Sequence, residues 1–473
     1  MHIFLFHRDL RLVDNTALIY QIQEVGEVIP IFIFPPEQID SAKNEYFSNN
    51  SVQFMIESLH ELSKDIKDKN GKLYFFKGDN MKVLKELHKL INIESISYNL
   101  DYTLYARLRD GEIKKWCEEN DIECYEKEDY VMYDILDGQT KKADKTPYLV
   151  FTPFKNFCYK NLTVPEVNTF NKFKFQKSSK IDSCKYLINE NKIDNFYNDN
   201  PDINVHGGRK NGLKILSNIS KFKDYDHGRD MFMYNTTFLS AYNHFSCVSI
   251  REVYHKIVEK LGKKSGLINE LHWRDFYYNL YYYVPHMLGK QIGKKNLAFK
   301  PKFDKIKWSY NKNLFEKWCN GTLGIPVCDA GMRQLNQTGF QHNRLRMVCS
   351  CVLTKLLNID WRYGEKYYAT KLVDYDPIQN SAGWNWQAGG IDPQQVFRIF
   401  SPKTQGEKFD PNCEYIKKWI PELNDVPIKD ILNWEEKYEE YLKEGIEYYK
   451  PAIDYKESRN KISKELLKLN KTN

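Results

Sequence analysis

The stretch VIPIFIF (residues 28–34) contains no charged side chain and ends in alternating isoleucine and phenylalanine. An uninterrupted apolar run of this length is typical of a strand that is buried on both faces of a parallel sheet. Three further short runs are similarly apolar: HIFLF (2–6), KLYFF (72–76) and SISYN (95–99). A helical candidate, SVQFMIESLHELSKDI (51–66), separates two of them. This alternation predicts an α/β domain with a doubly wound parallel sheet.

The C-terminal half shows a helical period instead. Examples are REVYHKIVEKLG (251–262), ELHWRDFYYNLYYYV (270–284) and RLRMVCSCVLTKLLN (344–358). Between the two halves, the stretch that follows PYLVFTPF (147–154) is rich in lysine, asparagine, aspartate and serine. Because structureless loops of that length are unusual inside a compact domain, we expect this stretch to connect two domains. The predicted domains are a Rossmann-like α/β domain (1–130), an interdomain connector (131–208) and an all-α domain (209–473).

Composition and charge are those of a folded protein with more than one domain. At 473 residues the chain is too long for one ordinary core. The net charge of +7 is compatible with a polyanionic partner without requiring one. The ten cysteines are irregularly spaced, which favours free thiols over a zinc site or a disulfide framework. The chain shows no signal peptide or bilayer-spanning apolar run, so we expect a soluble intracellular protein without a membrane partner, in cytoplasm or nucleus.

Two segments of the helical half combine polar and aromatic residues in unusual ways. NELHWRDFYY (269–278) places Glu270, Trp273 and Arg274 on one helix face. The simpler interpretation is a helix edge with a surface ion pair, and the alternative is a binding site. FQHNRLRMVCS (340–350) follows a stop at Gly339 and opens a second helix with an amide, two guanidiniums and a thioether. This opening is either a solvated helix end or the wall of a cavity.

The segment LVDYDPIQNSAGWNWQAGG (372–390) contains even more polar and aromatic residues that could form a site. Asp374 and Asp376 flank a tyrosine, and we expect Asn380 to follow in a loop that contains proline, serine and glycine. On a helix, Trp384 and Trp386 would be separated by about 200°, so their indoles would face different environments. The alternative is two unrelated packing aromatics beside a capped loop.

Hydroxyl groups precede another helical stretch, where Thr236, Thr237 and Ser240 could bind phosphate or simply cap the helix. No His-x-x-x-His or His-Glu-x-x-His pattern occurs, so no metal site is predicted. No Gly-x-Ser-x-Gly motif supports a serine nucleophile. No Gly-x-Gly-x-x-Gly follows the first strand, so a dinucleotide fingerprint is absent.

Taken together, these segments resemble the photolyase/cryptochrome flavoproteins along nearly the full chain. The resemblance rests on FHRDLRLVDNTAL (6–18), NLDYTLYARLRD (99–110), PVCDAGMRQLNQTGFQHNRLRMV (326–348), the segment 372–390 and FRIFSPKTQGEKFD (397–410). One departure is His7, where an arginine is commoner in the family. The closest resemblance is to class I-type photolyases that act on cyclobutane pyrimidine dimers.

The resemblance implies a helical domain that holds FAD, with the reduced anion as the active form. Arg346 would pair with Asp374, and Asn380 would lie against the reactive flavin nitrogen. The implied cofactor-binding residues are Tyr225, Thr236, Thr237, Phe238, Leu239, Ser240, Arg274, Arg346, Asp374, Tyr375, Asp376 and Asn380. A second antenna chromophore is possible, but Tyr105 and Ala106 do not reproduce the family's folate-binding pair. Folate, deazaflavin, flavin or an empty site therefore all stay open.

The resemblance also implies light-driven repair of UV-damaged DNA by a monomer, through electron transfer to a flipped-out dimer. Glu270 and Asn343 would contact the flipped bases, Trp273 and Trp386 would form aromatic walls, and Met347 would form an apolar floor. With Asn380, these five residues are the implied catalytic set. An electron relay would run through Trp384, Trp361 and Trp308. The implied DNA-binding residues are Arg229, Glu270, Trp273, Tyr277, Asn343, Arg344, Trp386, Arg398, Gln405 and Lys408.

Three alternatives compete with repair of cyclobutane dimers. A (6-4) photolyase would need histidines at the positions of Asn343 and Met347, so it is disfavoured. A cryptochrome would be a light sensor without repair, yet this chain keeps the implied pocket residues. A DASH-type protein that acts on single strands has a similar flavin pocket and is the weaker variant.

Overall fold

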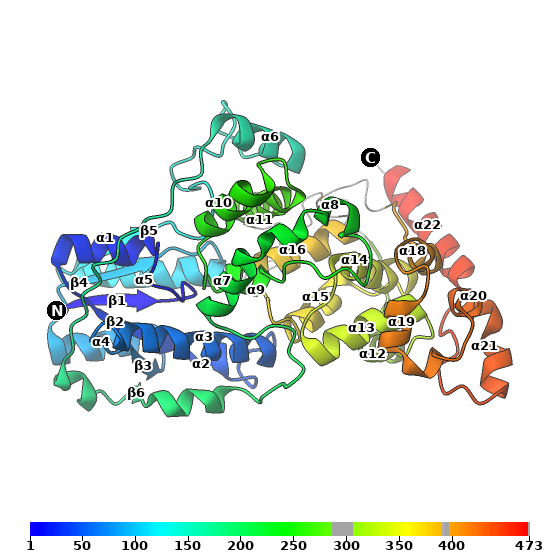
Figure 1. The fold of residues 1–473 in the computed structure, drawn as a ribbon, viewed down its shortest axis with the longest axis horizontal. Coiled ribbons are helices and arrows are strands. Elements are labelled where there is room, and N and C mark those ends of the chain that lie inside the picture. Colours follow the sequence, from blue (N-terminus) through cyan, green and yellow to red (C-terminus); the bar gives the residue numbers. More distant parts are fainter. Residues whose placement is uncertain (286–305, 390, 392–396, 472–473) are drawn as a thin grey trace. The chain divides into compact units, whose positions relative to one another are not determined.

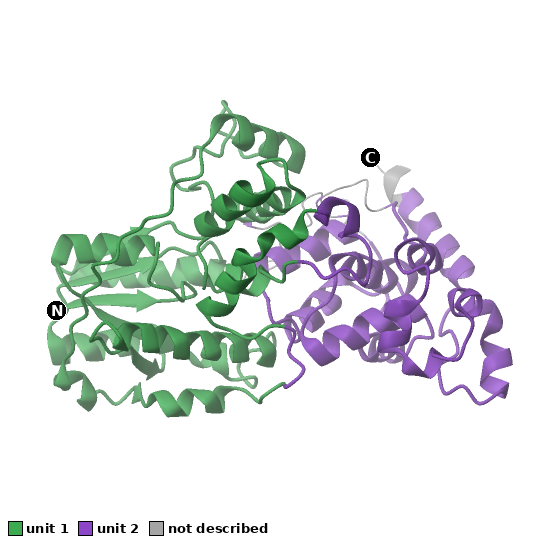
Figure 2. Ribbon diagram, viewed as in Figure 1, with its two compact units in different colours: residues 1–200, 205–223, 237–284 green, residues 201–204, 224–236, 285–473 purple. Residues whose placement is uncertain are grey.

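The computed structural model describes residues 1–285, 306–389, 391 and 397–471. The chain forms two compact units, shown in Figure 2. The first unit comprises residues 1–200, 205–223 and 237–284, and the second comprises 201–204, 224–236 and 285–473. These units divide the chain at other places than the predicted boundaries at 130 and 208. Most of the predicted connector groups with the α/β domain, together with the helices between residues 209 and 284 except the short helix at 225–228.

The first unit contains a six-stranded sheet with the strand order β5-β4-β1-β2-β3-β6. Strands β1 to β5 are parallel, and β6 pairs antiparallel with β3 at one edge. The α/β fold class is confirmed, and the four predicted strands are β1 to β4. The strands span His2–Phe6 (β1), Ile29–Phe34 (β2), Tyr74–Lys77 (β3), Ser95–Asn99 (β4), Glu123–Lys127 (β5) and Leu187–Ile188 (β6).

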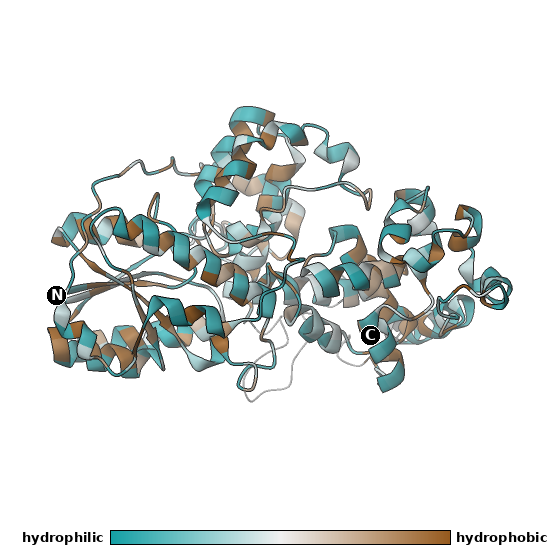
Figure 3. Ribbon diagram, turned by 60° about the horizontal axis from the view of Figure 1, so that its bottom comes forward, coloured by the Kyte–Doolittle hydropathy of each residue, from teal (hydrophilic) through white to brown (hydrophobic). Residues whose placement is uncertain are grey.

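Helices lie on both faces of this sheet, as Figure 1 shows. The predicted helix 51–66 is α3, which is buried all round at residues 52–56 and then mainly at Leu59, Leu62 and Ile66. Both units contain helices that carry hydrophilic and hydrophobic residues side by side (Figure 3). The α-helices of the first unit are α1 (Thr16–Val25), α2 (Pro36–Ile39), α3 (Asn49–Lys67), α4 (Asn80–Ile91), α5 (Leu104–Glu119), α6 (Phe151–Asn161), α7 (Arg209–Ser217), α9 (Ser240–His244), α10 (Ile250–Leu261) and α11 (Gly266–Tyr283).

Apart from one isolated bridge between Ser309 and Ile359, the regular secondary structure in the described residues of the second unit is helical, as predicted for the C-terminal part. Its core surrounds the buried indoles of Trp318, Trp384 and Trp434. Within the described part of the chain, no helix is both long and apolar enough to span a bilayer. The helices are α8 (Tyr225–Gly228), α12 (Lys312–Asn320), α13 (Pro326–Thr338), α14 (Asn343–Cys351), the π-helix η6 (Val352–Leu356), α15 (Trp361–Ala369), α16 (Pro377–Ala388), α18 (Pro402–Phe409), α19 (Glu414–Trp419), α20 (Ile428–Leu432), α21 (Trp434–Lys443) and α22 (Tyr455–Lys471).

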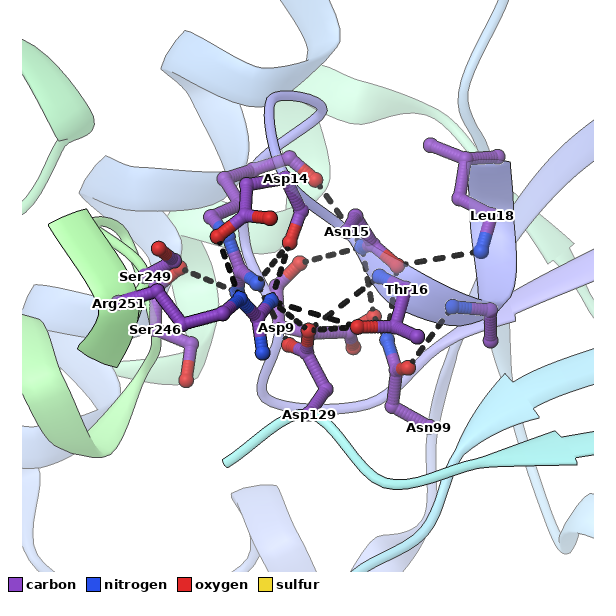
Figure 4. A network of polar contacts seen from close by, with 12 residues as sticks. Asp9, Asp14, Asn15, Thr16, Leu18, Asn99, Asp129, Ser246, Ser249 and Arg251 are labelled. Atoms are coloured by element: carbon purple, nitrogen blue, oxygen red, sulfur yellow. Dashed lines mark hydrogen bonds and ion pairs between the residues drawn. The ribbon is translucent and has the colours of Figure 1, made fainter. Parts of the chain in front are cut away.

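The N-terminal motif 6–18 forms a buried polar network in the first unit (Figure 4). Asp129, just after β5, accepts hydrogen bonds from Arg11 at 2.6 Å and from Arg251 of α10 at 2.7 Å. Arg251 also pairs with Asp14 at 2.7 Å. Burial alone would raise the pKa of Asp129, but the two guanidiniums hold that pKa below its usual range. These ion pairs therefore hold α10 against the N-terminal motif and the end of β5 within the first unit.

Candidate functional site

The segment 340–350 forms the predicted helix start. Helix α13 ends at Gly339, whose φ of 68° lies in the left-handed region. His342 is the N-cap of α14, and its Nδ1 accepts a hydrogen bond from the backbone N–H of Arg344 at 3.1 Å. Burial lowers the pKa of His342 to about 4, so the imidazole is neutral near neutral pH. The N-terminus of α14 is therefore fixed by an uncharged, buried cap.

The polar side chains of the first turns of α14 point to different partners. Arg344 forms an ion pair with Asp230 at 2.6 Å. Asn343 is exposed, and its Nδ2 lies 3.9 Å from the sulfur of half-buried Met347, one turn further along. Asn343 and Met347 thus share one side of the helix, as a contact with one ligand requires.

Arg346 pairs with Asp374, the contact that the resemblance implies. Its Nη2 lies 3.3 Å from both carboxylate oxygens, and its Nε donates to the main-chain oxygen of Gln341 at 3.0 Å. The Asp374 side chain is only 7% exposed, so the guanidinium compensates a charge that is largely withdrawn from water. The guanidinium is thereby fixed beside Asp374, in the segment that leads into α16, a helix that contacts α14.

Asn380 lies in the first turn of α16, and the predicted loop at this position is wrong. Asp376 caps the helix, because its Oδ1 accepts from the N–H groups of Ile378 and Gln379 at 2.9 and 3.0 Å. Pro377 occupies the first helical position, where the missing N–H costs nothing. The local sequence is therefore a helix start.

The amide of Asn380 is oriented by Glu365 of α15. Its Nδ2 donates to the main-chain oxygen of Glu365 at 3.0 Å and to the carboxylate Oε1 at 3.1 Å. Ser381 donates to the same Oε1 at 2.9 Å. Because Glu365 takes up the amide nitrogen, the oxygen Oδ1 is the atom that Asn380 can offer to a ligand.

The two tryptophans of α16 face different environments, as the helical spacing predicts. Trp384 is 4% exposed, whereas Trp386 is half-buried. A Cβ at Gly364 of α15 would overlap the indole of Trp384, so this ring lies directly against the helix backbone. Tyr368 and Trp318 complete its surroundings, with ring centroids at 5.1 and 6.0 Å.

The other two relay candidates belong to the same unit. Trp361 is the first residue of α15, one turn before Gly364. Trp308 precedes Ser309, whose N–H donates to the main-chain oxygen of Asn358 at 2.8 Å. The three relay tryptophans therefore lie on segments that are joined by direct backbone and ring contacts. Their role as a relay stays a prediction.

In the first unit, Glu270, Trp273 and Arg274 lie on α11, and all three are half-buried. Arg274 pairs with the neighbouring Asp275 at 3.1 Å, and the Arg274 side chain is only 12% exposed. Burial raises the pKa of Asp275 to about 6 although Arg274 opposes the shift. A solvated ion pair on a helix edge does not describe this face.

The hydroxyl-rich segment at 236–240 has a strained backbone. Phe238 has a φ of 54°, a left-handed conformation that is unusual for a bulky residue and that clusters at functional sites. The N-cap of α9 is Leu239, which makes no side-chain capping bond, so the hydroxyls do not cap this helix as N-cap residues. The Oγ1 of Thr237 accepts from the N–H of Leu239 at 3.4 Å. Tyr225 and Thr236 belong to the second unit, and Thr237 to Ser240 belong to the first.

Several candidate DNA contacts lie on the surface of the second unit. Arg398 and Lys408 are exposed, and Arg229 is half-buried with its guanidinium 5.9 Å from the ring centre of Tyr225. The main-chain oxygen of Arg398 accepts a hydrogen bond from Lys355 at 2.6 Å. Lys355 is 3% exposed, and its burial lowers its pKa to about 8. Gln405 and Tyr375 are half-buried, as is Tyr277 in the first unit.

The structure adds two residues that the sequence interpretation missed. Glu365 is fully buried and holds Asn380, and Lys355 is buried in the π-helix η6 and holds the segment of Arg398. A lysine inside the apolar run VLTKLL was a usable signal, because charged residues are seldom buried without a partner. Glu365 lies in a polar stretch that reads as a surface helix, so no sequence signal distinguished it.

The comparisons with known proteins agree with this geometry. Residues 2–171 match the family model described as DNA photolyase, and residues 267–468 match the FAD binding domain of DNA photolyase. A deoxyribodipyrimidine photo-lyase of Alkalihalophilus pseudofirmus is 32% identical over 96% of this chain and 95% of its own length. The chain belongs to the photolyase/cryptochrome family.

Solved structures of photolyases share the whole architecture. An archaeal photolyase from Sulfolobus tokodaii, crystallised with two FAD molecules, has a TM-score of 0.85 and 36% identity over 99% of both chains. A class III photolyase from Agrobacterium tumefaciens has a TM-score of 0.84 and 28% identity over 100% of this chain and 98% of its own. The α/β domain followed by a helical FAD-binding domain is thus the architecture of photolyases.

The residues of this chain fit a flavin. Asn380 offers an oriented amide oxygen, which suits an N–H group of a reduced isoalloxazine. The guanidinium of Arg346 is fixed beside the carboxylate of Asp374, and a guanidinium would be a suitable donor to the carbonyl oxygens at the polar edge of such a ring. Phe238 has a left-handed backbone among hydroxyl side chains, and such backbone conformations occur in the nests that bind phosphate.

His7, which stands where an arginine is commoner in the family, directly follows β1. Arg109 donates to its Nδ1 at 3.0 Å, and burial lowers the pKa of His7 well below its ordinary value. Nearby, Tyr105 is exposed and Ala106 is buried. The identity of a second chromophore stays open.

Proposed function

We propose that this protein uses blue light to split cyclobutane pyrimidine dimers in DNA, with FAD as its cofactor. The observation that carries the proposal is the match over 96% of the chain to a deoxyribodipyrimidine photo-lyase. When bound and reduced, FAD supplies an electron to the dimer on absorbing blue light. The chain itself must hold the cofactor, admit the dimer and fix both in place.

Residues of several chain segments would hold the cofactor. We assign the phosphates and ribityl chain to Tyr225, Thr236 and the segment 237–240, which combine hydroxyls with backbone N–H groups. Arg346 with Asp374 would hold the flavin edge, and the amide oxygen of Asn380 would accept a hydrogen bond from the flavin N–H. That acceptor stabilises the reduced form, because only the reduced ring carries a proton at this nitrogen.

The dimer must leave the base stack to reach the flavin. Glu270 and Asn343 would bind the polar edges of the flipped bases. Trp273 and Trp386 would contact the pyrimidine rings, and Met347 would supply a deformable apolar surface. Asn343 and Met347 occupy the positions where a (6-4) photolyase needs histidines, so this pocket favours the cyclobutane dimer.

The relay and the DNA contacts complete the proposal. Trp384, Trp361 and Trp308 would carry electrons from the surface to the flavin. Arg229, Arg344, Arg398 and Lys408 would contact phosphates, so affinity for DNA would fall as salt rises. We further propose that the protein acts as a monomer and inside the cell.

Substrate discrimination tests this proposal. The reduced protein would be illuminated with oligonucleotides that carry either one cyclobutane thymine dimer or one (6-4) photoproduct, in single-stranded and duplex form. We expect loss of the cyclobutane dimer in duplex DNA and no change in the (6-4) product. Repair confined to single strands would instead favour the DASH type, and loss of only the (6-4) product would contradict the proposal.

A further inference from the structure

The indole of Trp273 is stacked on another aromatic ring of the same chain. The ring of Phe151 lies parallel to it, with a centroid distance of 3.6 Å and an angle of 8° between the planes. Phe151 is the first residue of α6 and Trp273 lies in the second turn of α11, so the stack joins two helices of the first unit. Phe151 belongs to the part matched by the DNA photolyase model, and Trp273 belongs to the part matched by the FAD-binding model.

Neighbouring rings hold this stack in place. Phe151 is 9% exposed and meets Phe276 edge to face, with centroids 5.8 Å apart. Trp273 also contacts Tyr277, one turn further along α11, at 5.6 Å. A ring that is held on one face and along its edge cannot leave its rotamer without losing these contacts. Trp273 is nevertheless half-buried, so part of its surface stays accessible to a ligand.

We propose that Phe151 is a positioning residue for substrate. Its ring covers one face of the Trp273 indole and thereby fixes the orientation of that indole, whose opposite face receives a flipped pyrimidine. This inference rests on the proposed function, in which Trp273 contacts the dimer. An aromatic wall that is fixed before binding loses less conformational entropy when the base arrives. A mobile indole would have to be ordered at the expense of affinity.

Ordinary core packing is the competing explanation for Phe151, and the same helix provides a matched control. Phe154, one turn later in α6, is 1% exposed and packs against Phe276 at 5.5 Å. Among the described residues, its ring contacts do not include Trp273. Removing the Phe154 ring should therefore disturb the core of α6 and α11 without releasing the indole.

Binding in the dark separates the two explanations. The FAD-loaded protein would be titrated with an oligonucleotide that carries one thymine dimer and, separately, with an undamaged oligonucleotide of the same sequence (its undamaged twin). We expect Phe151→Leu to weaken binding to the dimer about fivefold, the size of one aromatic pair, with binding to the undamaged twin unchanged. Phe151→Tyr should restore the preference, and Phe154→Leu should keep it.

A double-mutant cycle tests whether Phe151 acts through Trp273. In a Trp273→Leu background, Phe151→Leu should change dimer affinity by less than about twofold, because the ring that it positions is gone. In the parent background, Phe151→Leu should also reduce the near-ultraviolet circular dichroism contributed by Trp273. FAD content measured for every variant verifies folding, and Phe151→Met replaces Phe151→Leu if the latter does not fold.

Two results would overturn the inference. One is that Phe151→Leu binds the dimer as tightly as the parent does. The other is that Phe151→Leu weakens dimer binding by the same factor in the parent and in the Trp273→Leu background. A parent protein that does not distinguish the dimer from its undamaged twin would refute the proposed function itself, which is a different outcome.

Discussion

The side-chain amide nitrogen of Asn380 donates both to the main-chain oxygen of Glu365, 3.0 Å away, and to its carboxylate, 3.1 Å away. Because this double contact uses the amide nitrogen, the amide oxygen is the atom that Asn380 can offer to a ligand. In the proposed function that oxygen would accept a hydrogen bond from the N–H group of the reduced flavin. A buried glutamate on α15 would thereby favour the reduced form of the cofactor through Asn380 of α16.

Glu365→Gln should therefore destabilise the reduced cofactor. Glutamine removes the charged acceptor of the Asn380 amide nitrogen and adds an Nε2 that competes with the flavin for Asn380 Oδ1, at a cost of about one hydrogen bond. We expect the reduced protein to reoxidise in air roughly fivefold faster, since one such bond contributes about 1 kcal/mol. Stopped-flow absorbance measures the rate. Ser381→Ala leaves the Asn380 contact intact and should reoxidise at the parent rate, whereas an unchanged rate in Glu365→Gln would contradict this role.

Gly364→Ala should displace Trp384. A Cβ at Gly364 would overlap the indole and also crowd Leu353, so we expect a loss of about 1–3 kcal/mol in unfolding free energy and slower photoreduction. Gly383→Ala is the control, because a Cβ there meets nothing within 4 Å. In a helix that replacement should stabilise the protein by up to about 1 kcal/mol. Equal stability of the two variants would show that Trp384 does not lie against Gly364.

Trp308→Phe should separate photoreduction from repair. If Trp308 is the outer end of the relay, the variant should lose photoreduction by an added thiol, because phenylalanine is much harder to oxidise. After chemical reduction it should repair dimers at the parent rate. Trp434→Phe, which changes a buried indole at the start of α21, should keep both activities. Repair by Trp308→Phe that stays low after chemical reduction would refute the relay assignment.

His342 should make the protein sensitive to acid. Its folded-state pKa of about 4 lies below the ordinary 6.5. The unfolded chain therefore binds a proton between these values that the folded chain does not, and stability falls as pH drops from 6.5 toward 4. At pH 5 this linkage amounts to about 2 kcal/mol.

His342→Asn removes the titrating group and keeps a good N-cap for α14. Urea denaturation at pH 8 and pH 5 should show that the stability of the variant, relative to the parent, improves by about 2 kcal/mol at the lower pH. A difference between parent and variant that does not change with pH would mean that His342 is not held neutral.

The sequence predicts the sheet well where strands are buried and poorly at its edges. Strands β1 to β4 are apolar runs, but β5 reads ECYEK with mostly half-buried residues, and β6 has only two residues. Edge strands need no continuous apolar pattern, so periodicity does not reveal them. The prediction of a loop at Asn380 is wrong because it takes proline, serine and glycine as residues that interrupt a helix. Aspartate before Pro377 was in fact a helix-start signal.

Individual site residues could be named from motifs, but not the contacts that orient them. Arg346 and Asp374 were paired from the resemblance, and the structure contains that pair. Glu365 and Phe151 contact residues of other helices, and their own local sequences are those of an ordinary polar helix and an ordinary aromatic segment. Only the folded structure brings Glu365 to Asn380 and Phe151 to Trp273.

The central claim is light-driven splitting of cyclobutane dimers, and one measurement tests it most directly. Chemically reduced, FAD-loaded protein would be mixed with an oligonucleotide that carries one thymine dimer, and the dimer would be quantified after blue light or darkness. We predict that the dimer disappears in light and persists in darkness, and that Glu270→Ala and Asn343→Ala repair at least about tenfold less. Persistence of the dimer under blue light with fully reduced protein would contradict the account and favour a cryptochrome-type sensor.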